Sequence, residues 1–285
     1  MIDIDMELKA RVMEHYKDAL KLYPEERIVG IFLQGSQNYY LDDEESDVDT
    51  KLLVVPTLDE IIFNRKPVSV THIRDNDEHI DAKDIRLYWQ CFRKGNPNFV
   101  EILFSRVSYV NPMYQDLWHK MVAMAEDVAR VNPLASAKAM MGMIQEKFHA
   151  MEHRYPSRAD IVDRFGYDPK QLSHLIRMTW FLNEYVEDDY SYEDILTLYQ
   201  PIDEEGNPDE TFRNYLKDIK RGRVYILEEA REVAAHWLQC AEKALTNAKE
   251  MYSGEEDGLV SARMDEILGD MIKRAVRNEL QKENE

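Results

Sequence analysis

The sequence predicts an α+β protein, in which a small domain of strands and helices over residues 1–110 precedes an all-helical domain over residues 111–285. In the first part, short apolar runs of strand length are closed by turn residues, as at residues 28–33, which a Gly-Ser pair follows. In the second part, apolar residues recur at helical spacing over long stretches. This change of pattern near residue 110 marks the expected domain boundary.

The elements expected in the first domain alternate between strands and helices. A helix comes first, and the second strand runs into Pro56, which ends it. The third and fourth strands flank the turn at residues 75–77 and form a hairpin. The expected strands are residues 28–33, 47–55, 68–73 and 79–83, and the expected helices are residues 5–21, 58–63, 85–92 and 99–104.

Helix openers and breakers divide the second domain. Asn111-Pro112 and Asn132-Pro133 each precede a helical run, because proline fits the first turn of a helix. Residues 201–208 are rich in Asp, Glu, Gly and Asn, a composition typical of a loop. The expected helices are residues 113–130, 134–151, 169–186, 224–251 and 259–280.

Charge and composition limit the partners that we expect. The formal net charge is −19, and such a surface repels nucleic acid at long range, so we expect no DNA partner. Any RNA end would need a local basic patch. Two cysteines far apart in sequence favour a cytoplasmic protein without a disulfide framework. The start lacks the order of a signal peptide, and no window reaches the roughly 20 apolar residues of a membrane span, so we expect no membrane partner.

Two acidic residues at the start of the second strand indicate a cation site. Asp47 and Asp49 are two residues apart, and side chains alternate between faces along a strand, so both carboxylates point the same way. Like charges held side by side repel each other, and a divalent cation between them relieves this repulsion. The alternative is a solvated strand end, which is common in an acidic chain.

A third carboxylate and a glycine turn extend this candidate site. Asp81 lies in the fourth strand, and the three acids converge if that strand neighbours the second. Three convergent carboxylates suit two Mg²⁺ ions that clamp a triphosphate. A turn such as Gly35-Ser36 lets backbone N–H groups and a hydroxyl approach phosphate oxygens. Alternatively, the pair is only a turn and Asp81 is a salt-bridged residue of an edge strand. The ordered combination favours the site.

In this order and context, the Gly35-Ser36 pair, the motif Asp47-Val48-Asp49 and Asp81 resemble the polymerase-β-type nucleotidyltransferase superfamily. The strings GSQNYYLDDEESDVDTK and HIDAKDIRLYWQCFRKGNPNFVEILFS are similar to the predicted nucleotidyltransferases of bacteria and phages. The resemblance implies a mixed sheet flanked by helices, with Mg²⁺ and a nucleoside triphosphate at the carboxylates. By position, Gly35 and Ser36 would hold the β- and γ-phosphates, Asp47 and Asp49 would ligate metal, and Asp81 would complete the triad.

Charged residues around the motifs depart from this simple picture. The loop at residues 42–45 carries four acids, which would weaken triphosphate binding unless they face solvent. Asp84 competes with Asp81 as the third ligand, but at three positions along a continuing strand it would face away, so we favour Asp81. Lys83 and Arg86 follow, either to approach phosphate or to balance Asp84.

The segment at residues 95–101 also matches the family. Its residues alone favour a turn between helices, with Asn98 as N-cap and Glu101 at the third helical position.

The helical half offers a basic set. Lys170, His174 and Arg177 are spaced i, i+4 and i+7, which puts them on one helix face. Three potential cations in a stripe suit a triphosphate, and the resemblance implies a basic helix across the nucleotide cleft from the carboxylates, in a helical domain that closes it. The alternative is a solvated helix face with a histidine packed at its edge.

These observations predict a metal-dependent nucleotidyltransferase of the NTP-dependent 2.7.7 class, which moves a nucleoside monophosphate from an NTP such as ATP to an acceptor hydroxyl and releases pyrophosphate. An RNA 3′ end, a protein side chain and a small molecule all stay open as acceptors. The first alternative is a catalytically silent nucleotide-binding or antitoxin-like interaction module. The second is a helical scaffold with a small acidic domain, whose NTP affinity would not depend on metal.

Overall fold

The computed structural model describes residues 2–43, 46–199 and 210–282, and the chain divides into two compact units. Unit 1 comprises Met1–Asn38, Glu45–Val131 and Glu256–Glu285, and unit 2 comprises Tyr39–Glu44 and Asn132–Glu255. Residues 111–131 and the C-terminal helix therefore group with the sheet, whereas the sequence-based boundary at residue 110 assigns them to the helical part.

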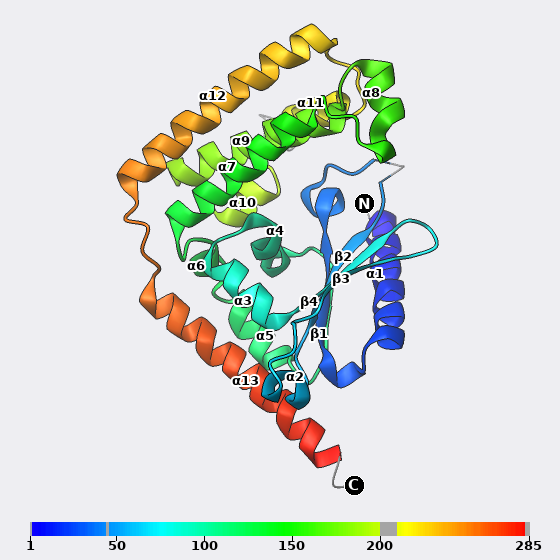
Figure 1. Cartoon of the computed structure of the whole chain (residues 1–285), viewed down its shortest axis with the longest axis vertical. Helices are drawn as coiled ribbons and strands as arrows, with labels where there is room; N and C mark the ends of the chain where they lie inside the picture. Colours follow the sequence, from blue (N-terminus) through cyan, green and yellow to red (C-terminus); the bar gives the residue numbers. More distant parts are fainter. Residues whose placement is uncertain (1, 44–45, 200–209, 283–285) are drawn as a thin grey trace. The chain divides into compact units, whose positions relative to one another are not determined.

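Unit 1 contains a five-stranded sheet with the strand order β3-β4-β2-β1-β5 (Figure 1). The pairs β1–β2, β1–β5 and β3–β4 are antiparallel, whereas β2 and β4 are parallel, so the sheet is mixed. The expected α+β fold class and the expected β3–β4 hairpin are confirmed. The strands are β1 (Ile28–Gln34), β2 (Asp49–Val54), β3 (Ser69–Ile73), β4 (His79–Asp84) and β5 (Ser108–Val110).

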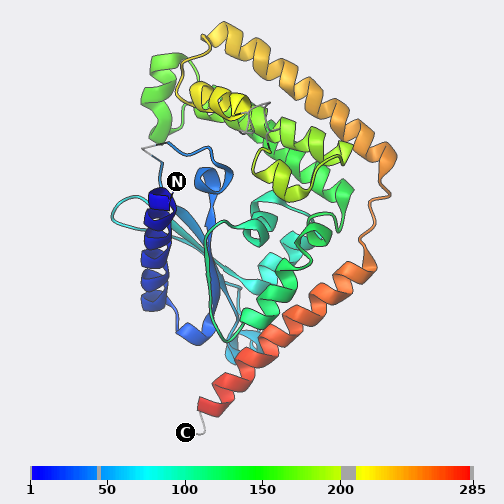
Figure 2. The same ribbon diagram turned by 180° about the vertical axis from the view of Figure 1, so that it is seen from behind.

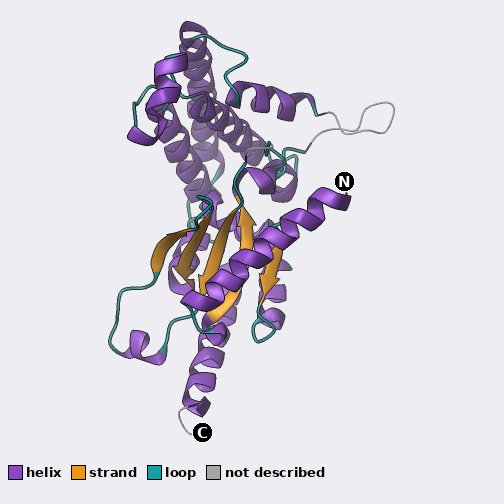
Figure 3. Ribbon diagram, turned by 90° about the vertical axis from the view of Figure 1, so that its right-hand side faces the viewer, coloured by secondary structure: helices purple, strands orange, loops and turns teal. Residues whose placement is uncertain are grey.

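One face of the sheet packs on the N-terminal helix α1 (Ile2–Leu22), as Figures 1 and 3 show. Alternating strand residues point to this face and form a hydrophobic core with the helix. Full burial of each such side chain contributes about 1.5–3 kcal/mol. The buried members include Leu8 and Val12 of the helix and Ile31, Leu33, Val48, Leu52, Val54, Ile80 and Ala82 of the sheet region.

Several helices cover the opposite face of the sheet (Figure 2). On this face Phe32 packs against Trp118, with ring centroids 4.5 Å apart. The C-terminal helix α13 returns to this side, because Asp265 accepts hydrogen bonds from Trp89 and Arg93. The other elements of unit 1 are η1 (Glu25–Arg27), α2 (Leu58–Ile62), α3 (Ile85–Arg93), α4 (Pro97–Val100), η3 (Glu101–Phe104), α5 (Gln115–Val122), α6 (Ala125–Ala129) and α13 (Gly258–Lys282). The 3₁₀ turn η2 (Gly35–Tyr39) follows β1 and runs into the first segment of unit 2.

Unit 2 is helical, and α7, α9 and α12 pack side by side (Figure 1). The buried residues of α12 are all alanine, at helical spacing, and their small side chains permit close contact between helices. The described elements are α7 (Pro133–Ala150), η4 (Pro156–Arg158), α8 (Ala159–Phe165), α9 (Pro169–Glu187), α10 (Tyr192–Leu196), α11 (Thr211–Lys220) and α12 (Leu227–Met251).

The structure corrects several sequence-based elements. Asp47 lies before β2, not in it, and the helix expected over residues 113–130 is broken into α5 and α6 at residues 123–124. The expected loop at residues 201–208 lies outside the described residues. Among the helices that the structure describes, none is both long and apolar enough to cross a membrane.

Candidate active site

The register of β2 and β4 decides where the third aspartate lies. Lys51 and Asp81 are direct partners across these parallel strands, so their side chains leave the sheet on the same face. Asp49 is two residues before Lys51 on β2 and shares that face. From strand spacing and rise, the Cα atoms of Asp49 and Asp81 lie roughly 8 Å apart. The sheet thus brings these two carboxylates to one face, opposite the α1 core.

Asp47 lies just before β2, but its side chain follows the same alternation between the two faces of the sheet. Val48 is fully buried in the α1 core, whereas Asp47 is exposed and Asp49 is partly exposed. Because Val48 points to one face, its two neighbours are directed away from that core. The motif therefore has one anchor residue between two accessible carboxylates.

The turn between β3 and β4 holds this motif in place. The backbone N–H of Val48 donates to Oε1 of Glu78 at 3.3 Å, and the N–H of His79 donates to Oδ1 of Asp49 at 3.1 Å. Glu78 is buried and also binds Arg11 and His15. Burial raises the pKa of Glu78, but hydrogen bonds from His15, Asn76 and Arg11 outweigh it and lower that pKa to about 2. Glu78 is therefore an ionised anchor for the motif.

A buried ion pair lies on the same face of the sheet. Nζ of Lys51 is 3.0 Å from Oε1 of Glu101, and these side chains are only 5% and 3% exposed. The ammonium of Lys51 also lies 5.0 Å from the centroid of the Phe99 ring, within cation–π distance. Removal of either charged partner would leave the other charge buried without its counter-ion.

Asp81 has an ammonium partner of its own. Nζ of Lys83 lies 3.0 Å from Oδ1 of Asp81, and the Thr71 hydroxyl donates to the same oxygen at 3.4 Å. The alternative prediction, that Asp81 is a salt-bridged residue of an edge strand, is thus correct about the salt bridge. It is wrong about the strand, because β4 lies between β3 and β2 in the sheet. Lys83 neutralises Asp81, so it does not balance Asp84.

The donor chemistry of this face suits a hard divalent cation, because Asp47, Asp49 and Asp81 offer carboxylate oxygens. The hydroxyl of Tyr88 is buried and makes no hydrogen bond within the described residues, which leaves a donor available beside these charges. Burial, and then the charges of Asp81 and Glu101, raise the pKa of Tyr88 well above its usual value. In the described part of the chain, no three His, Cys, Asp or Glu side chains are grouped closely enough to hold a metal ion. Asp49 and Asp81 contact protein donors instead.

The Gly35-Ser36 turn follows directly from β1. Gly35 has φ +77°, a conformation that favours glycine, and open space surrounds the position of a Cβ atom. Arg106 fixes the next residues: its backbone N–H donates to Oδ1 of Asn38 at 3.0 Å and its guanidinium donates to the carbonyl of Gln37 at 2.7 Å. Gln34, at the end of β1, pairs with Asp49, so the turn begins beside the first strand carboxylate.

Asp84 has a structural role. Its fully buried side chain caps α3 by accepting the Arg86 N–H at 2.8 Å, and it forms an ion pair with the Arg86 guanidinium at 2.7 Å. Asp84 pairs with Val54, which belongs to the α1 core, so it lies on the face opposite Asp81.

The expected cap at Asn98 is wrong, because Asn96 caps α4 and Pro97 occupies its first turn. Glu101 likewise does not occupy the expected third helical position, and its carboxylate is the partner of Lys51.

The expected basic set lies on α9 of unit 2, and its members differ. Lys170 is exposed, whereas Arg177 is 8% exposed and its guanidinium lies 4.3 Å from the centroid of the Tyr39 ring. Burial, with the nearby cations Arg177 and Lys170, holds the pKa of His174 well below its usual value. His174 is therefore neutral at pH 7, and the stripe contains two cations instead of three.

The acidic loop also contacts unit 2 helices. Asp43 forms an ion pair with Lys220 of α11 at 3.2 Å, so one of the four loop charges is neutralised by protein. Tyr40, in a left-handed conformation with φ +60°, lies 4.9 Å from the Arg213 guanidinium. Glu44 and Glu45 lie outside the described residues.

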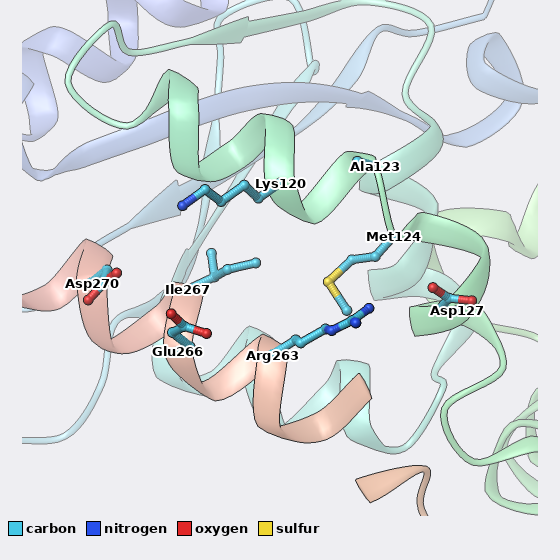
Figure 4. A pocket seen from close by; sticks show the side chains of 8 residues that line it. All are labelled: Lys120, Ala123, Met124, Asp127, Arg263, Glu266, Ile267 and Asp270. Carbon is cyan, nitrogen blue, oxygen red and sulfur yellow. The ribbon is translucent and has the colours of Figure 1, made fainter. Parts of the chain in front are cut away.

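Unit 1 also has a cavity of about 340 Å³ along α13 that no sequence-predicted site residue lines (Figure 4). Met124 and Ile267 supply apolar surface, and charged side chains surround them. The lining residues are Lys120, Ala123, Met124, Asp127, Arg263, Glu266, Ile267 and Asp270.

The residues that sequence reasoning missed are Lys51, Glu78 and Glu101. The spacing of Lys51 from Asp49 on one strand was an available signal, because alternation puts both on one face. Glu78 and Glu101 gave no local signal, since their partners are distant in sequence.

The sheet is mixed, the carboxylates of its neighbouring strands β2 and β4 lie on one face, and a Gly-Ser turn follows β1. These features define a polymerase-β-type nucleotidyltransferase fold. The chain matches, over residues 5–186, the family described as RlaP, RNA repair pathway DNA polymerase beta family. This match covers more than half of the chain, and the protein belongs to that family.

No curated protein matches the chain. Among solved structures, the chain is similar to a nucleotidyltransferase-like protein from Exiguobacterium sibiricum, with 10% identity, a TM-score of 0.32, and coverage of 83% of this chain and 74% of that one.

Proposed function

We propose that this protein is a metal-dependent enzyme that transfers a nucleoside monophosphate from an NTP to an acceptor hydroxyl and releases pyrophosphate. The observation that carries the proposal is the register that puts Asp81 on the face of Asp49. Membership of a polymerase-β-type family supports the same reaction class. Asp47, Asp49 and Asp81 would hold Mg²⁺, which would neutralise phosphate charge and activate the attacking hydroxyl.

The protein's own groups would position the reactants. The backbone N–H groups of the Gly35-Ser36 turn and the Ser36 hydroxyl would bind terminal phosphate oxygens, since the open, left-handed glycine permits close approach. Glu78 and His79 would fix the motif around Val48 so that Asp49 keeps one orientation. Lys170 and Arg177 would supply further phosphate contacts. Catalysis would then rest on positioning and electrostatic stabilisation.

An RNA 3′ hydroxyl is the acceptor that we favour. The family description names an RNA repair pathway, which supports RNA over a protein side chain or a small metabolite. The net charge of −19 argues against broad electrostatic binding of a long polynucleotide, so an RNA end is the fitting substrate.

The Lys83–Asp81 ion pair, which occupies a proposed metal ligand, favours a catalytically silent nucleotide-binding module. Calorimetric titration with each NTP, with and without Mg²⁺, tests both functions when it is combined with a pyrophosphate-release assay. The proposed enzyme shows Mg²⁺-dependent binding and release of pyrophosphate in the presence of an RNA end. Binding without release would support the silent module, and affinity independent of Mg²⁺ would contradict the metal site.

A further inference from the structure

The two lysines on the carboxylate face have different partners. Lys51 is almost fully buried and pairs with Glu101, a carboxylate that is 3% exposed. Lys83 and Asp81 are 18% and 19% exposed, so solvent and ions reach this second pair. The Lys51–Glu101 pair is therefore part of the protein interior. In the more accessible Lys83–Asp81 pair, another cation can replace the ammonium at the Asp81 carboxylate.

Lys83 makes further contacts in addition to its ion pair with Asp81. Its ammonium donates a hydrogen bond to Oγ of Ser69 on the neighbouring strand β3 at 3.3 Å and lies 6.0 Å from the centroid of the Phe99 ring. A hydroxyl acceptor and an aromatic face can both stabilise an ammonium that has left a carboxylate. Release from Asp81 would therefore not leave Lys83 without favourable contacts.

We propose that Lys83 is the resident cation of Asp81: its ammonium occupies the carboxylate in the metal-free protein and yields it when a divalent ion binds. This inference rests on the proposed function, since it assumes that Asp81 is a metal ligand. Lys83 is a positioning residue in this scheme, because it holds Asp81 in a defined orientation and prevents repulsion between Asp49 and Asp81.

The exchange has a direct consequence for affinity. A divalent ion must displace an existing ion pair to reach Asp81, and that competition weakens its binding. A side chain of similar size without charge would remove the competitor and leave the carboxylate free. Lys83→Met should therefore bind metal more tightly than the natural protein, although it has lost a charge beside the site.

Titration of the protein with Mn²⁺ alone, monitored by the electron paramagnetic resonance signal of the free ion, measures this affinity without turnover. We expect about tenfold tighter Mn²⁺ binding in Lys83→Met, which corresponds to about 1.4 kcal/mol. Lys17→Met is the matched control, because it removes the same charge from an exposed site on α1, across the sheet. Its Mn²⁺ affinity should stay within twofold of the natural protein.

The Asp81→Asn background makes the test specific. The double-mutant cycle compares the effect of Lys83→Met in the natural protein with its effect in Asp81→Asn. If Lys83 acts through Asp81, Lys83→Met does not change the Mn²⁺ affinity of Asp81→Asn. Circular dichroism verifies that each variant is folded. If Lys83→Met binds Mn²⁺ as tightly as the natural protein or more weakly, the inference is overturned. The proposed function is unaffected by that result, provided that the natural protein binds Mn²⁺. No Mn²⁺ binding in either protein overturns both.

Discussion

Lys51 and Asp81 are direct partners across the parallel strands β2 and β4, yet their side chains pair with Glu101 and Lys83 instead of with each other. The register fixes the face on which Asp81 lies, which is also the face of Asp49. Glu101 and Asp81 thus each have a lysine partner before any ligand binds. The predictions below test which of these groups are structural and which belong to the reaction.

The carboxylates of the motif should be needed for transfer but not for folding. We expect Asp47→Ala and Asp49→Ala to reduce Mg²⁺-dependent pyrophosphate release by at least about 100-fold. Their free energies of unfolding in urea should change by less than about 1 kcal/mol, because both side chains are accessible. Asp75→Asn, which neutralises an exposed acid in the β3–β4 turn, should release pyrophosphate at the natural rate. Natural rates in both motif variants would defeat the mechanism.

Asp81 and Asp84 should respond in opposite ways. Asp84→Asn weakens the ion pair between the fully buried Asp84 and Arg86 at the start of α3, so it should lower stability by about 1.5–3 kcal/mol. Its rate at 25 °C should stay within about threefold of natural, since Asp84 lies on the other face of the sheet. Asp81→Asn should reverse this pattern, with a rate loss of about 100-fold or more. Urea titration and the pyrophosphate assay on both variants decide, and a larger rate loss in Asp84→Asn would identify the wrong third ligand.

The buried pair of Lys51 and Glu101 should be costly to break from one side. Lys51→Met leaves the buried carboxylate of Glu101 without its ammonium partner, and we expect a loss of about 3–5 kcal/mol in the free energy of unfolding. The double variant Lys51→Met/Glu101→Leu removes both charges and should recover most of this loss. Denaturant unfolding measures both. A single variant within about 1 kcal/mol of the natural protein would show that the pair is not a structural element.

Acid should destabilise unit 1 in two stages. Burial lowers the pKa of His15 below 6.5, although its hydrogen bond to Glu78 acts in the opposite direction. Both folded-state pKa values lie below their unfolded values, so both contributions are complete at high pH and are lost as pH falls. The His15 contribution should decline from about pH 6.5 downward, and that of Glu78 between pH 4.5 and about 2.

The contribution of Glu78 to the free energy of unfolding that is lost in acid amounts to roughly 3 kcal/mol. Urea titrations at a series of pH values from 7 to 3 check this course. In His15→Gln, the decline between pH 7 and 5 should be smaller. A free energy of unfolding that is constant or rises as pH falls through this range would contradict the assignment.

The two cations of α9, both proposed to contact phosphate, should differ in their effect on stability. Arg177→Met loses a buried guanidinium stacked on Tyr39 and should destabilise the protein by about 1–2 kcal/mol. Lys170→Met alters an exposed side chain and should leave stability unchanged while it weakens Mg²⁺-NTP binding several-fold. Calorimetry and urea unfolding give the two quantities. Natural NTP affinity in Lys170→Met would remove this residue from the nucleotide site.

The sequence allowed the strand pattern and the shared face of Asp49 and Asp81 to be predicted because these depend on local periodicity, whereas Asp47 lies before the strand in which it was expected. The apolar run of β1, the β3–β4 hairpin and the alternation on β2 are properties of short segments. Pro97 was also a local signal, since proline favours the first helical position and so marks Asn96 as the cap. An N-cap at Asn98 would have placed this proline before the helix instead of in its first turn.

The electrostatic arrangement of the site could not be predicted in the same way. Lys51 and Glu101 are far apart in sequence, as are His15 and Glu78, and only the folded sheet brings each pair together. The lowered pKa of His174 likewise depends first on burial within the helical unit, to which its helix neighbours Arg177 and Lys170 add a smaller effect. Local pattern identified the acids, whereas tertiary contacts determine their partners.

The most direct test of the central claim compares NTPs labelled at the α- or γ-phosphate, incubated with Mg²⁺, the purified protein and an RNA that ends in a free 3′ hydroxyl. Transfer of a nucleoside monophosphate predicts that the α-label becomes attached to the RNA, that the γ-label is recovered as pyrophosphate, and that Asp49→Ala does neither. Attachment of the γ-label to an acceptor, or an α-label that reaches neither RNA nor any component of a cell extract, would contradict it.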